Sequence, residues 1–277
     1  MPCKRTRFAV NIASLPMYDL PEVTAATDAW WSGIARALAR EGVADVPVNL
    51  VRDCDTKTVW RSPDLLFSQT CGYPLMHDFV GQLRVVATPS YDAAGCKGPF
   101  YRSLIVVRAD DPAQTLDDLR GRFAAANAPD SQSGYSALRS AVAVVAQSAS
   151  FFSKVVMSGG HANSLALVAS GAADVCAVDC VTHALLARHR PAALANLRVL
   201  GETVAAPGLP YVTRAGAGGD LLQRLRAALN AALADPALAA TREDLLIAGI
   251  EVLPETAYDR IIEIEEEARA RGYACLA

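Results

Sequence analysis

The sequence has no excess of basic residues. Its 26 lysines and arginines are outnumbered by 29 aspartates and glutamates, which gives a formal net charge of −3. A nucleic-acid groove needs a basic face, so we expect no nucleic-acid partner. A small anion remains compatible with this charge, because a helix dipole can hold an anion without net positive charge nearby.

Long apolar runs are missing too. No stretch approaches the roughly 18 to 20 apolar residues that are needed to cross a membrane. We therefore expect that the chain does not span a membrane. The first seven residues, Met-Pro-Cys-Lys-Arg-Thr-Arg, run into an apolar segment (8–13) without a small-residue cleavage site. This is typical of a first strand rather than a signal peptide. No export signal is visible, and the sequence taken by itself also allows a cytoplasmic location.

Paired metal-binding cysteines are absent as well. The seven cysteines are an odd number and form no Cys-x-x-Cys motif, so no metal site is expected. Cys176 and Asp179 are three residues apart on a predicted strand, so their side chains would face opposite sides of the sheet and could not bind one metal ion together. Buried free thiols in a reducing compartment are the simplest interpretation. A nucleotide site is not indicated either, because Leu221 replaces the third glycine that would follow Gly216-Ala-Gly-Gly219, and no cofactor is expected.

What the sequence does contain is an alternation of apolar strands and amphipathic helices, which predicts an α/β fold with a parallel sheet covered by helices. Strands are expected at 7–13, 46–51, 65–67, 83–87, 101–108, 122–126, 154–157, 175–178, 197–200 and 211–213. Helices are expected at 24–40, 116–119, 136–146, 162–170, 181–189, 221–233, 242–248 and 258–271.

Two segments rich in proline and glycine, near 88–99 and 203–210, bracket a complete α/β unit. They predict a lobe inserted at 91–205 and a discontinuous first lobe made of 1–90 and 206–277. Two lobes joined by two crossings form a cleft that can close on a ligand by hinge motion.

A polar turn lies in the predicted inserted lobe. Asn127–Tyr135 reads Asn-Ala-Pro-Asp-Ser-Gln-Ser-Gly-Tyr and stands between a predicted strand and a predicted helix. The free N–H groups of a helix start carry the positive end of the helix dipole and can hold a small anion. The simpler interpretation is that these residues only cap the helix.

Five stretches together resemble the phosphonate- and phosphate-type substrate-binding proteins of ABC importers, which have the two-lobed type II periplasmic-binding-protein fold. The stretches are Tyr101–Arg108, Ser131–Tyr135, Ser158–Leu165, Gly171–Asp179 and Pro207–Val212. The resemblance implies a monomeric, periplasmic, non-enzymatic protein that captures a small anionic solute and delivers it to an ABC permease.

The resemblance also implies a set of ligand-binding residues. The anion would lie on the turn formed by Ser131, Ser133, Gly134 and Tyr135, and the family's cleft histidine and aspartate fall on His161 and Asp179. Tyr18 and Tyr73 would line the sides of the cleft. Gln69 and Thr70 also follow a predicted strand, so we expect them to contact the ligand too. Asp179 also fits a helix cap, since Val181 and Thr182 follow it.

Two other functions stay open at this point. An enzyme on the same fold could act on a small carboxylate or a pyrimidine-type substrate, with Cys71, His161 and Asp179 as its reactive groups. However, no nucleophile, base and orienting group form a legible set. A cytoplasmic ligand sensor is the second alternative, and only the missing export signal favours it.

Overall fold

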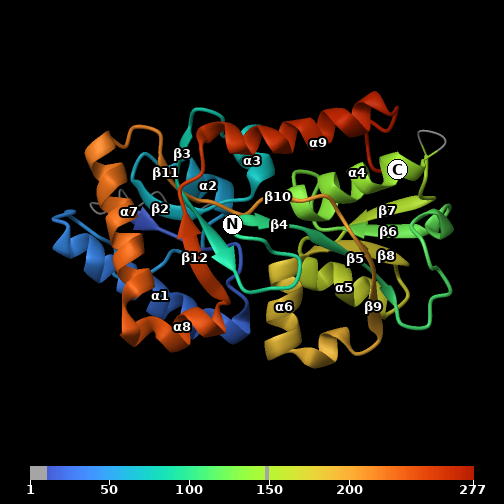
Figure 1. Cartoon of the computed structure of the whole chain (residues 1–277), viewed down its shortest axis with the longest axis horizontal. Coiled ribbons are helices and arrows are strands. Elements are labelled where there is room, and N and C mark those ends of the chain that lie inside the picture. The colour runs from blue at the N-terminus through green and yellow to red at the C-terminus, as the bar shows by residue number, and fades with distance from the viewer. Residues whose placement is uncertain (1–10, 147–149) are drawn as a thin grey trace. The chain divides into compact units, whose positions relative to one another are not determined.

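The computed structural model describes residues 11–146 and 150–277. They form two compact units (Figure 1). Unit 1 consists of Met1–Cys71, His77–Tyr91 and Gly208–Glu255, and unit 2 of Gly72–Met76, Asp92–Pro207 and Thr256–Ala277. The cleft and the hinge closure expected from the sequence concern the arrangement of the two units and stay predictions.

Unit 1 is built on a five-stranded sheet in the order β1-β2-β11-β3-β12. The strands are β1 (Ile12–Ala13), β2 (Leu65–Gln69), β11 (Tyr211–Arg214), β3 (Leu83–Tyr91) and β12 (Ile247–Glu251). Among the described strands of this sheet, β1 and β2 pair in parallel, whereas β11 runs antiparallel to β2 and β3, and β12 runs antiparallel to β3. The sequence predicted a parallel sheet, and the sheet of this unit is mixed instead.

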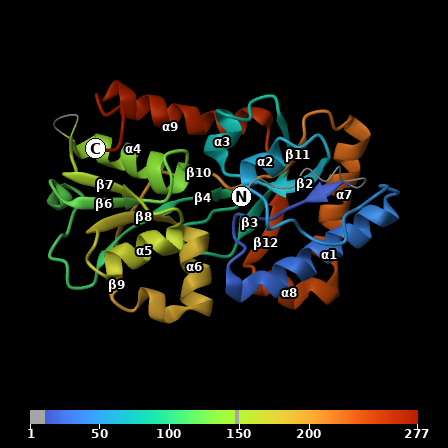
Figure 2. The ribbon, with the colours of Figure 1, turned by 180° about the vertical axis from the view of Figure 1, so that it is seen from behind.

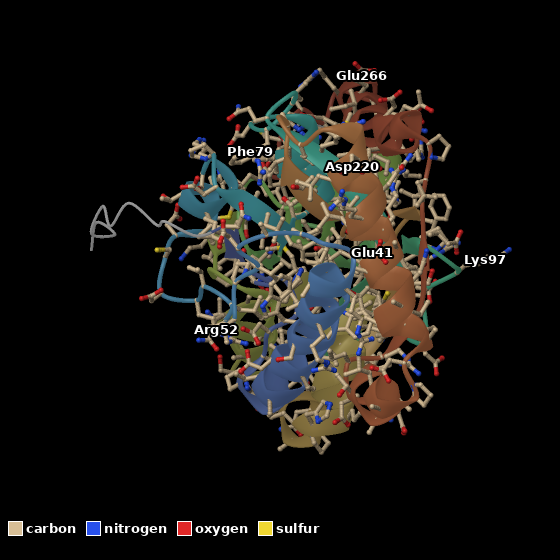
Figure 3. All side chains as sticks on the ribbon, turned by 90° about the vertical axis from the view of Figure 1, so that its left-hand side faces the viewer. Glu41, Arg52, Phe79, Lys97, Asp220 and Glu266 are labelled. Atoms are coloured by element: carbon tan, nitrogen blue, oxygen red, sulfur yellow. The ribbon has the colours of Figure 1, made fainter. Side chains whose placement is uncertain are left out.

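The helices of unit 1 pack mainly through α1 and α7. They are α1 (Thr24–Arg40), α2 (Thr56–Trp60), α7 (Gly219–Ala234) and α8 (Ala239–Asp244). Arg224 in the second turn of α7 donates to the carbonyls of Glu41 and Gly42 at 2.9 and 3.1 Å, which fixes the end of α1 against the beginning of α7. Figure 3 labels Glu41 and Asp220 at these two ends.

Unit 2 is built on a second five-stranded sheet, in the order β7-β6-β8-β5-β9. The strands are β7 (Lys154–Met157), β6 (Phe123–Ala126), β8 (Val175–Asp179), β5 (Ser103–Arg108) and β9 (Leu197–Glu202), beside a small pair of β4 (Phe100–Tyr101) and β10 (Ala206–Pro207). β6 pairs in parallel with both β7 and β8, whereas β5 is antiparallel to β8 and β9. This sheet is also mixed rather than parallel.

Helices cover both faces of the unit 2 sheet (Figures 1 and 2). α4 (Ala137–Val145) and α9 (Asp259–Ala270) lie on one face, and α5 (His161–Ala169) and α6 (Cys180–His189) lie on the other. The short α3 (Gly72–Met76) packs against α9. Single-turn 3-10 segments occur at Pro21–Val23, Asp117–Leu119, Pro191–Leu194, Pro236–Leu238 and Glu255–Tyr258.

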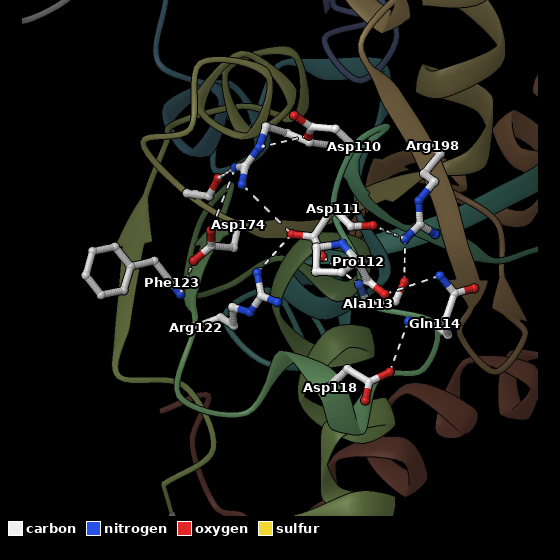
Figure 4. A network of polar contacts seen from close by, with 12 residues as sticks. Asp110, Asp111, Pro112, Ala113, Gln114, Asp118, Arg122, Phe123, Asp174 and Arg198 are labelled. Atoms are coloured by element: carbon white, nitrogen blue, oxygen red, sulfur yellow. Dashed lines mark hydrogen bonds and ion pairs between the residues drawn. The ribbon is translucent and has the colours of Figure 1, made fainter.

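An ion-pair network holds the end of the unit 2 sheet at which β5 finishes and β6 begins (Figure 4). Arg122 donates to the buried Asp111 carboxylate at 2.9 Å, and Arg108 lies between Asp111 and Asp174 at 3.9 and 3.7 Å. The Phe123 N–H donates to Asp174 at 2.9 Å. These contacts anchor the end of the sheet opposite to the one where β6, β7 and β8 finish.

The C-terminal segment differs from the predicted division of the chain. Residues 206–277 were expected in the first lobe, but Thr256–Ala277 and also Gly72–Met76 pack in unit 2. The buried Arg139 of α4 donates to the Ala274 carbonyl at 2.8 Å and lies 3.6 Å from the buried Glu265 of α9. Ala268, Tyr273 and Leu276 belong to the core of unit 2, which explains this assignment.

Two further predictions fail locally. The strand expected at 46–51 is irregular, since Pro47 has no N–H to donate and Val48 is 82% exposed. The helix expected at 242–248 ends at Asp244, after which Leu246 adopts a positive φ of 57° and β12 begins. Of the strand expected at 7–13, residues 7–10 lie outside the described part of the chain. In the described ranges, no helix is long and apolar enough to cross a membrane.

Candidate functional site

The polar residues singled out in the sequence of unit 2 meet at one edge of its sheet. β6, β7 and β8 are parallel neighbours, so their carboxyl ends lie side by side. Asn127 follows β6, Ser158 follows β7, and Asp179 ends β8. Ligands of open α/β sheets bind beyond the carboxyl ends of strands. The topology therefore collects these turns where a ligand is expected.

The helical segment that follows β6 begins with a π-helical turn before it becomes a regular α-helix. Gln132–Ser136 is a π-turn in which the Ser136 N–H donates to the Ser131 carbonyl at 3.0 Å, and α4 continues from Ala137. Ser131 is the N-cap, and its hydroxyl accepts from the Gly134 N–H at 3.1 Å. Single π-turns are frequent at functional sites, and a helix start presents N–H groups that lack helical acceptors.

His161 is joined directly to this turn. Its Nε2 atom lies 2.8 Å from the Ser133 hydroxyl, which links the turn after β6 with the first residue of α5. Burial lowers the pKa of His161 to about 4. Part of the residue remains accessible to solvent. The imidazole is therefore neutral at pH 7, so it can accept or donate one proton toward Ser133.

Gly134 makes the close approach possible. A Cβ atom built on Gly134 would lie 1.9 Å from Asn127 Oδ1 and 3.1 Å from His161 Cε1. Only glycine leaves room for both side chains. Asn127, directly after β6, and His161, after the neighbouring β7, therefore both lie against Gly134, which the sequence pattern did not reveal for Asn127.

Several polar atoms around the turn are buried without a hydrogen-bond partner. They are Asn127 Oδ1, Ser136 Oγ and His161 Nδ1 among the described residues. Buried polar groups are nearly always paired in native proteins, with protein groups, water or a ligand. Because the two ends of a carboxamide exchange by a flip, the buried Asn127 atom can also be a donor. Three such atoms around one helix start indicate a site that a polar ligand completes.

Asp179 lies at the same edge but is engaged as a helix cap. Its Oδ1 atom accepts from the N–H groups of Val181 and Thr182 at 2.7 and 3.0 Å, and the residue is 1% exposed. This is the cap that the sequence offered as the alternative role, and such caps contribute about 1 kcal/mol. A ligand contact for Asp179 stays a prediction.

Tyr135 and Tyr73, the two tyrosines of unit 2 that were predicted to bind the ligand, contact other parts of unit 2. The Tyr135 hydroxyl accepts from the Leu276 N–H at 3.1 Å, and the ring packs against the unit 2 core, so its side chain holds the C-terminal segment. Tyr73 lies on α3, and its pKa is raised first by burial and then by the charge of Glu265 on α9. Neither side chain joins the Ser133–His161 pair through a hydrogen bond that the structure shows.

Two of the predicted residues of unit 1, Tyr18 and Gln69, contact Tyr91. Gln69 donates to the Tyr91 hydroxyl and to the Leu209 carbonyl, each at 3.0 Å, and Tyr18 packs edge-on against the Tyr91 ring with centroids 5.1 Å apart. The Thr70 hydroxyl donates to the adjacent Cys71 carbonyl at 3.2 Å. Tyr91 was missed because it ends a strand that the sequence predicted to stop at Ala87.

Among residues 11–146 and 150–277, no group of three histidine, cysteine, aspartate or glutamate side chains is placed to hold a metal ion. The site of unit 2 is thus described by its hydroxyls, backbone N–H groups, the Asn127 carboxamide and one imidazole. No lysine or arginine occurs in the turn 127–136.

The low pKa of His161 predicts a pH-dependent stability. The unfolded chain binds a proton on His161 near its ordinary pKa of 6.5, whereas the folded chain resists it down to about 4. Stability is therefore unaffected above pH 7 and is lost as the pH falls from about 6.5 to 4, by about 2 kcal/mol after allowance for the accessible part of the ring. Urea unfolding between pH 7 and 4.5 measures this loss.

His161→Gln is expected to flatten that pH profile relative to the wild type, since glutamine does not titrate. His189→Gln, at the end of α6, is the matched control for losing a histidine and should keep the wild-type slope. Parallel profiles for wild type and His161→Gln would contradict the assignment of a buried neutral imidazole.

Comparison with known proteins agrees with this architecture. The sequence model of a family described as "ABC transporter, phosphonate, periplasmic substrate-binding protein" matches residues 12–258. A search of curated proteins found no match. Among solved structures, the binding protein component of an ABC phosphonate transporter from Pseudomonas aeruginosa is 16% identical, with 95% of this chain and 87% of that chain covered at a TM-score of 0.72.

Two other solved structures are similar over nearly their whole length. PhnD1 from Prochlorococcus marinus, in complex with methylphosphonate, is 17% identical, with 94% of this chain and 98% of that chain covered and a TM-score of 0.69. A protein from Xanthomonas citri bound to chloride ion is 18% identical, with 95% and 98% covered and a TM-score of 0.71. At these identities the similarity shows a shared fold, that of two-lobed periplasmic binding proteins.

Proposed function

We propose that this chain, which belongs to the family of periplasmic substrate-binding proteins of phosphonate ABC transporters, holds the anionic head of its solute on the Ser131–Ser136 turn. The family membership makes it a solute-binding protein of the two-lobed fold. The anion class and the residues that bind it are the part we add.

The observation that supports the proposal is the set of unpaired polar atoms around the π-turn, together with the Ser133–His161 contact of 2.8 Å. With the imidazole proton on Nε2, His161 donates to the Ser133 oxygen. The Ser133 proton can then point toward a ligand oxygen. Backbone N–H groups and the dipole at the start of α4 supply the remaining attraction for negative charge.

The absence of lysine and arginine from the turn bears on selectivity. A site that binds an anion with uncharged donors depends for its affinity and selectivity on the number and direction of its hydrogen bonds. A phosphonate or phosphate presents three or four oxygens in a fixed tetrahedral arrangement, which suits a turn with several converging donors. We therefore favour phosphonate- or phosphate-type groups over carboxylates.

The family supports a proposal about the partner and the compartment. We propose that a permease of an ABC importer receives the solute, that the protein is a monomer, and that it acts in the periplasm. Co-purification of the permease and subcellular fractionation of the native host test these points separately from ligand binding.

The proposed ligand class is tested with a thermal-shift screen and native mass spectrometry. We expect inorganic phosphate or methylphosphonate to raise the melting temperature in a concentration-dependent way, because a ligand that binds only the folded state stabilises it. Sulfate and acetate at equal ionic strength are the controls. A rise with acetate and none with any phosphorus oxyanion would contradict the proposal.

The alternative of an enzyme is separated by the same sample. A binding protein returns its ligand unchanged, so the recovered solute should have its original mass after prolonged incubation. Conversion of the solute by purified protein, lost on substitution of His161, would favour the enzyme instead.

A further inference from the structure

Two cysteines of unit 2 lie close enough to react with each other. The Cys96 and Cys180 sulfur atoms are 3.4 Å apart although 84 residues separate them in the sequence. Cys180 is the first residue of α6 and is 1% exposed, while Cys96 lies in the turn that leads into β4 and is partly accessible. Both are free thiols in the structure.

The backbone around this pair is arranged for close approach. Gly95 has a φ of +99°, and a Cβ atom there would lie 3.0 Å from Cys180 Cβ and 3.3 Å from its sulfur. The Cys180 N–H donates to the Arg102 carbonyl at 3.1 Å, which ties the start of α6 to the segment between β4 and β5. A disulfide has sulfur atoms about 2.0 Å apart, so side-chain rotation without large backbone movement can close the remaining gap.

We propose that Cys96 and Cys180 form a disulfide when the protein is in an oxidising compartment. The sequence suggested buried free thiols in a reducing compartment, and the pairing in space replaces that interpretation for these two residues. Families that act in the periplasm meet the conditions under which disulfides persist.

The reaction is a thiol–disulfide exchange in which both thiols are oxidised. The accessible Cys96 thiolate attacks the disulfide of an oxidant, such as oxidised glutathione or a dithiol oxidoreductase, and releases one oxidant thiolate. The Cys180 thiolate then attacks Cys96 Sγ, forms the Cys96–Cys180 bond and releases the second thiolate. Two protons leave the cysteines, and the oxidant is reduced by two electrons.

The hydrogen bond with Cys96 and burial raise the pKa of Cys180, so its thiolate is scarce at neutral pH. This describes the reduced pair, in which the exposed side of Cys96 makes it the thiol that meets the oxidant first. Closure would hold the turn before β4 against the start of α6, next to the Asp179 cap.

The test uses the full chain equilibrated with oxidised glutathione under native conditions, followed by alkylation and peptide mapping without reductant. We expect a cross-linked peptide pair containing Cys96 and Cys180, and a melting temperature about 5 °C above that of the reduced protein. Cys96→Ser should lose both, whereas Cys275→Ser should keep both. Alkylation of both thiols after equilibration, or a cross-link to another cysteine, would overturn the proposal.

A second variant tests the geometry while keeping both thiols. Gly95→Ala places a Cβ against Cys180 and should slow disulfide formation at least tenfold. Gly121→Ala also replaces a glycine of positive φ (75°) in unit 2, but nothing lies within 4 Å of its Cβ position, so it controls for backbone strain. Equal rates of closure in the two variants would contradict the role assigned to Gly95.

Discussion

Replacing Ser131 and Ser133 together with alanine is expected to abolish the stabilisation of this protein by phosphate or methylphosphonate. The Ser131 hydroxyl caps the π-turn through Gly134, and the Ser133 hydroxyl contacts His161, so both lie where an anion would accept their protons. Hydrogen bonds to a charged ligand contribute about 2 kcal/mol each, and two of them correspond to about a 1000-fold loss of affinity. Calorimetric titration measures that loss directly.

The double variant should still fold. Loss of the Ser131 cap costs about 1 kcal/mol, which a chain of this size tolerates. Ser140→Ala is the matched control, since Ser140 is a buried serine one turn into α4 and lies outside the Ser131–Ser136 turn. A wild-type shift in the double variant would sink the assignment of the anion to this turn, whatever the family's general function.

The meeting of the polar turns that form the candidate site could be predicted, because it depends on local patterns. Strand-ending polar turns are visible in the sequence, and β6, β7 and β8 were predicted within one or two residues of their observed bounds. Once these strands are parallel neighbours, their carboxyl ends must meet. The Ser133–His161 contact, between residues 28 positions apart, follows from that topology.

The packing of distant segments could not be predicted in the same way. An amphipathic helix at 259–270 shows that one face is buried but not which unit buries it. The segment is held in unit 2 by hydrogen bonds from Arg139 and to Tyr135. The Ala277 carbonyl also accepts from the N–H groups of Phe151 and Phe152. These are long-range contacts of single groups and leave no periodic signal. Strand direction was missed for a similar reason, since an apolar run has no polarity of its own.

The individual side chains of the site were harder still. Tyr135 stands in the turn by sequence, yet its hydroxyl bonds to Leu276. Asn127 opens the same stretch and was not selected, because an asparagine after a strand is equally typical of any turn. Its importance is visible only in the space that Gly134 leaves for it.

Gly134→Ala is therefore expected to disable the site by crowding. The new Cβ would lie 1.9 Å from Asn127 Oδ1 and 2.8 Å from Asn127 Cγ, so the carboxamide must leave its position. His161, whose Cε1 would be 3.1 Å away, would be pushed from Ser133. Overpacking of this kind costs about 1 to 3 kcal/mol, and we expect the affinity for methylphosphonate to fall at least 100-fold. Chemical unfolding and calorimetric titration measure the two effects separately.

A second substitution divides the effect of crowding from the loss of a contact. Gly134→Ala combined with Asn127→Ala removes the overlap and should restore most of the lost stability. Gly201→Ala is the control, because nothing lies within 4 Å of its Cβ position, and it should change stability and affinity little. If the Asn127 carboxamide binds the ligand, the double variant will remain weak although it is stable again, and Asn127→Ala alone will be equally weak. Full recovery of affinity in the double variant would instead assign Asn127 a space-filling role and leave the anion to the turn and His161.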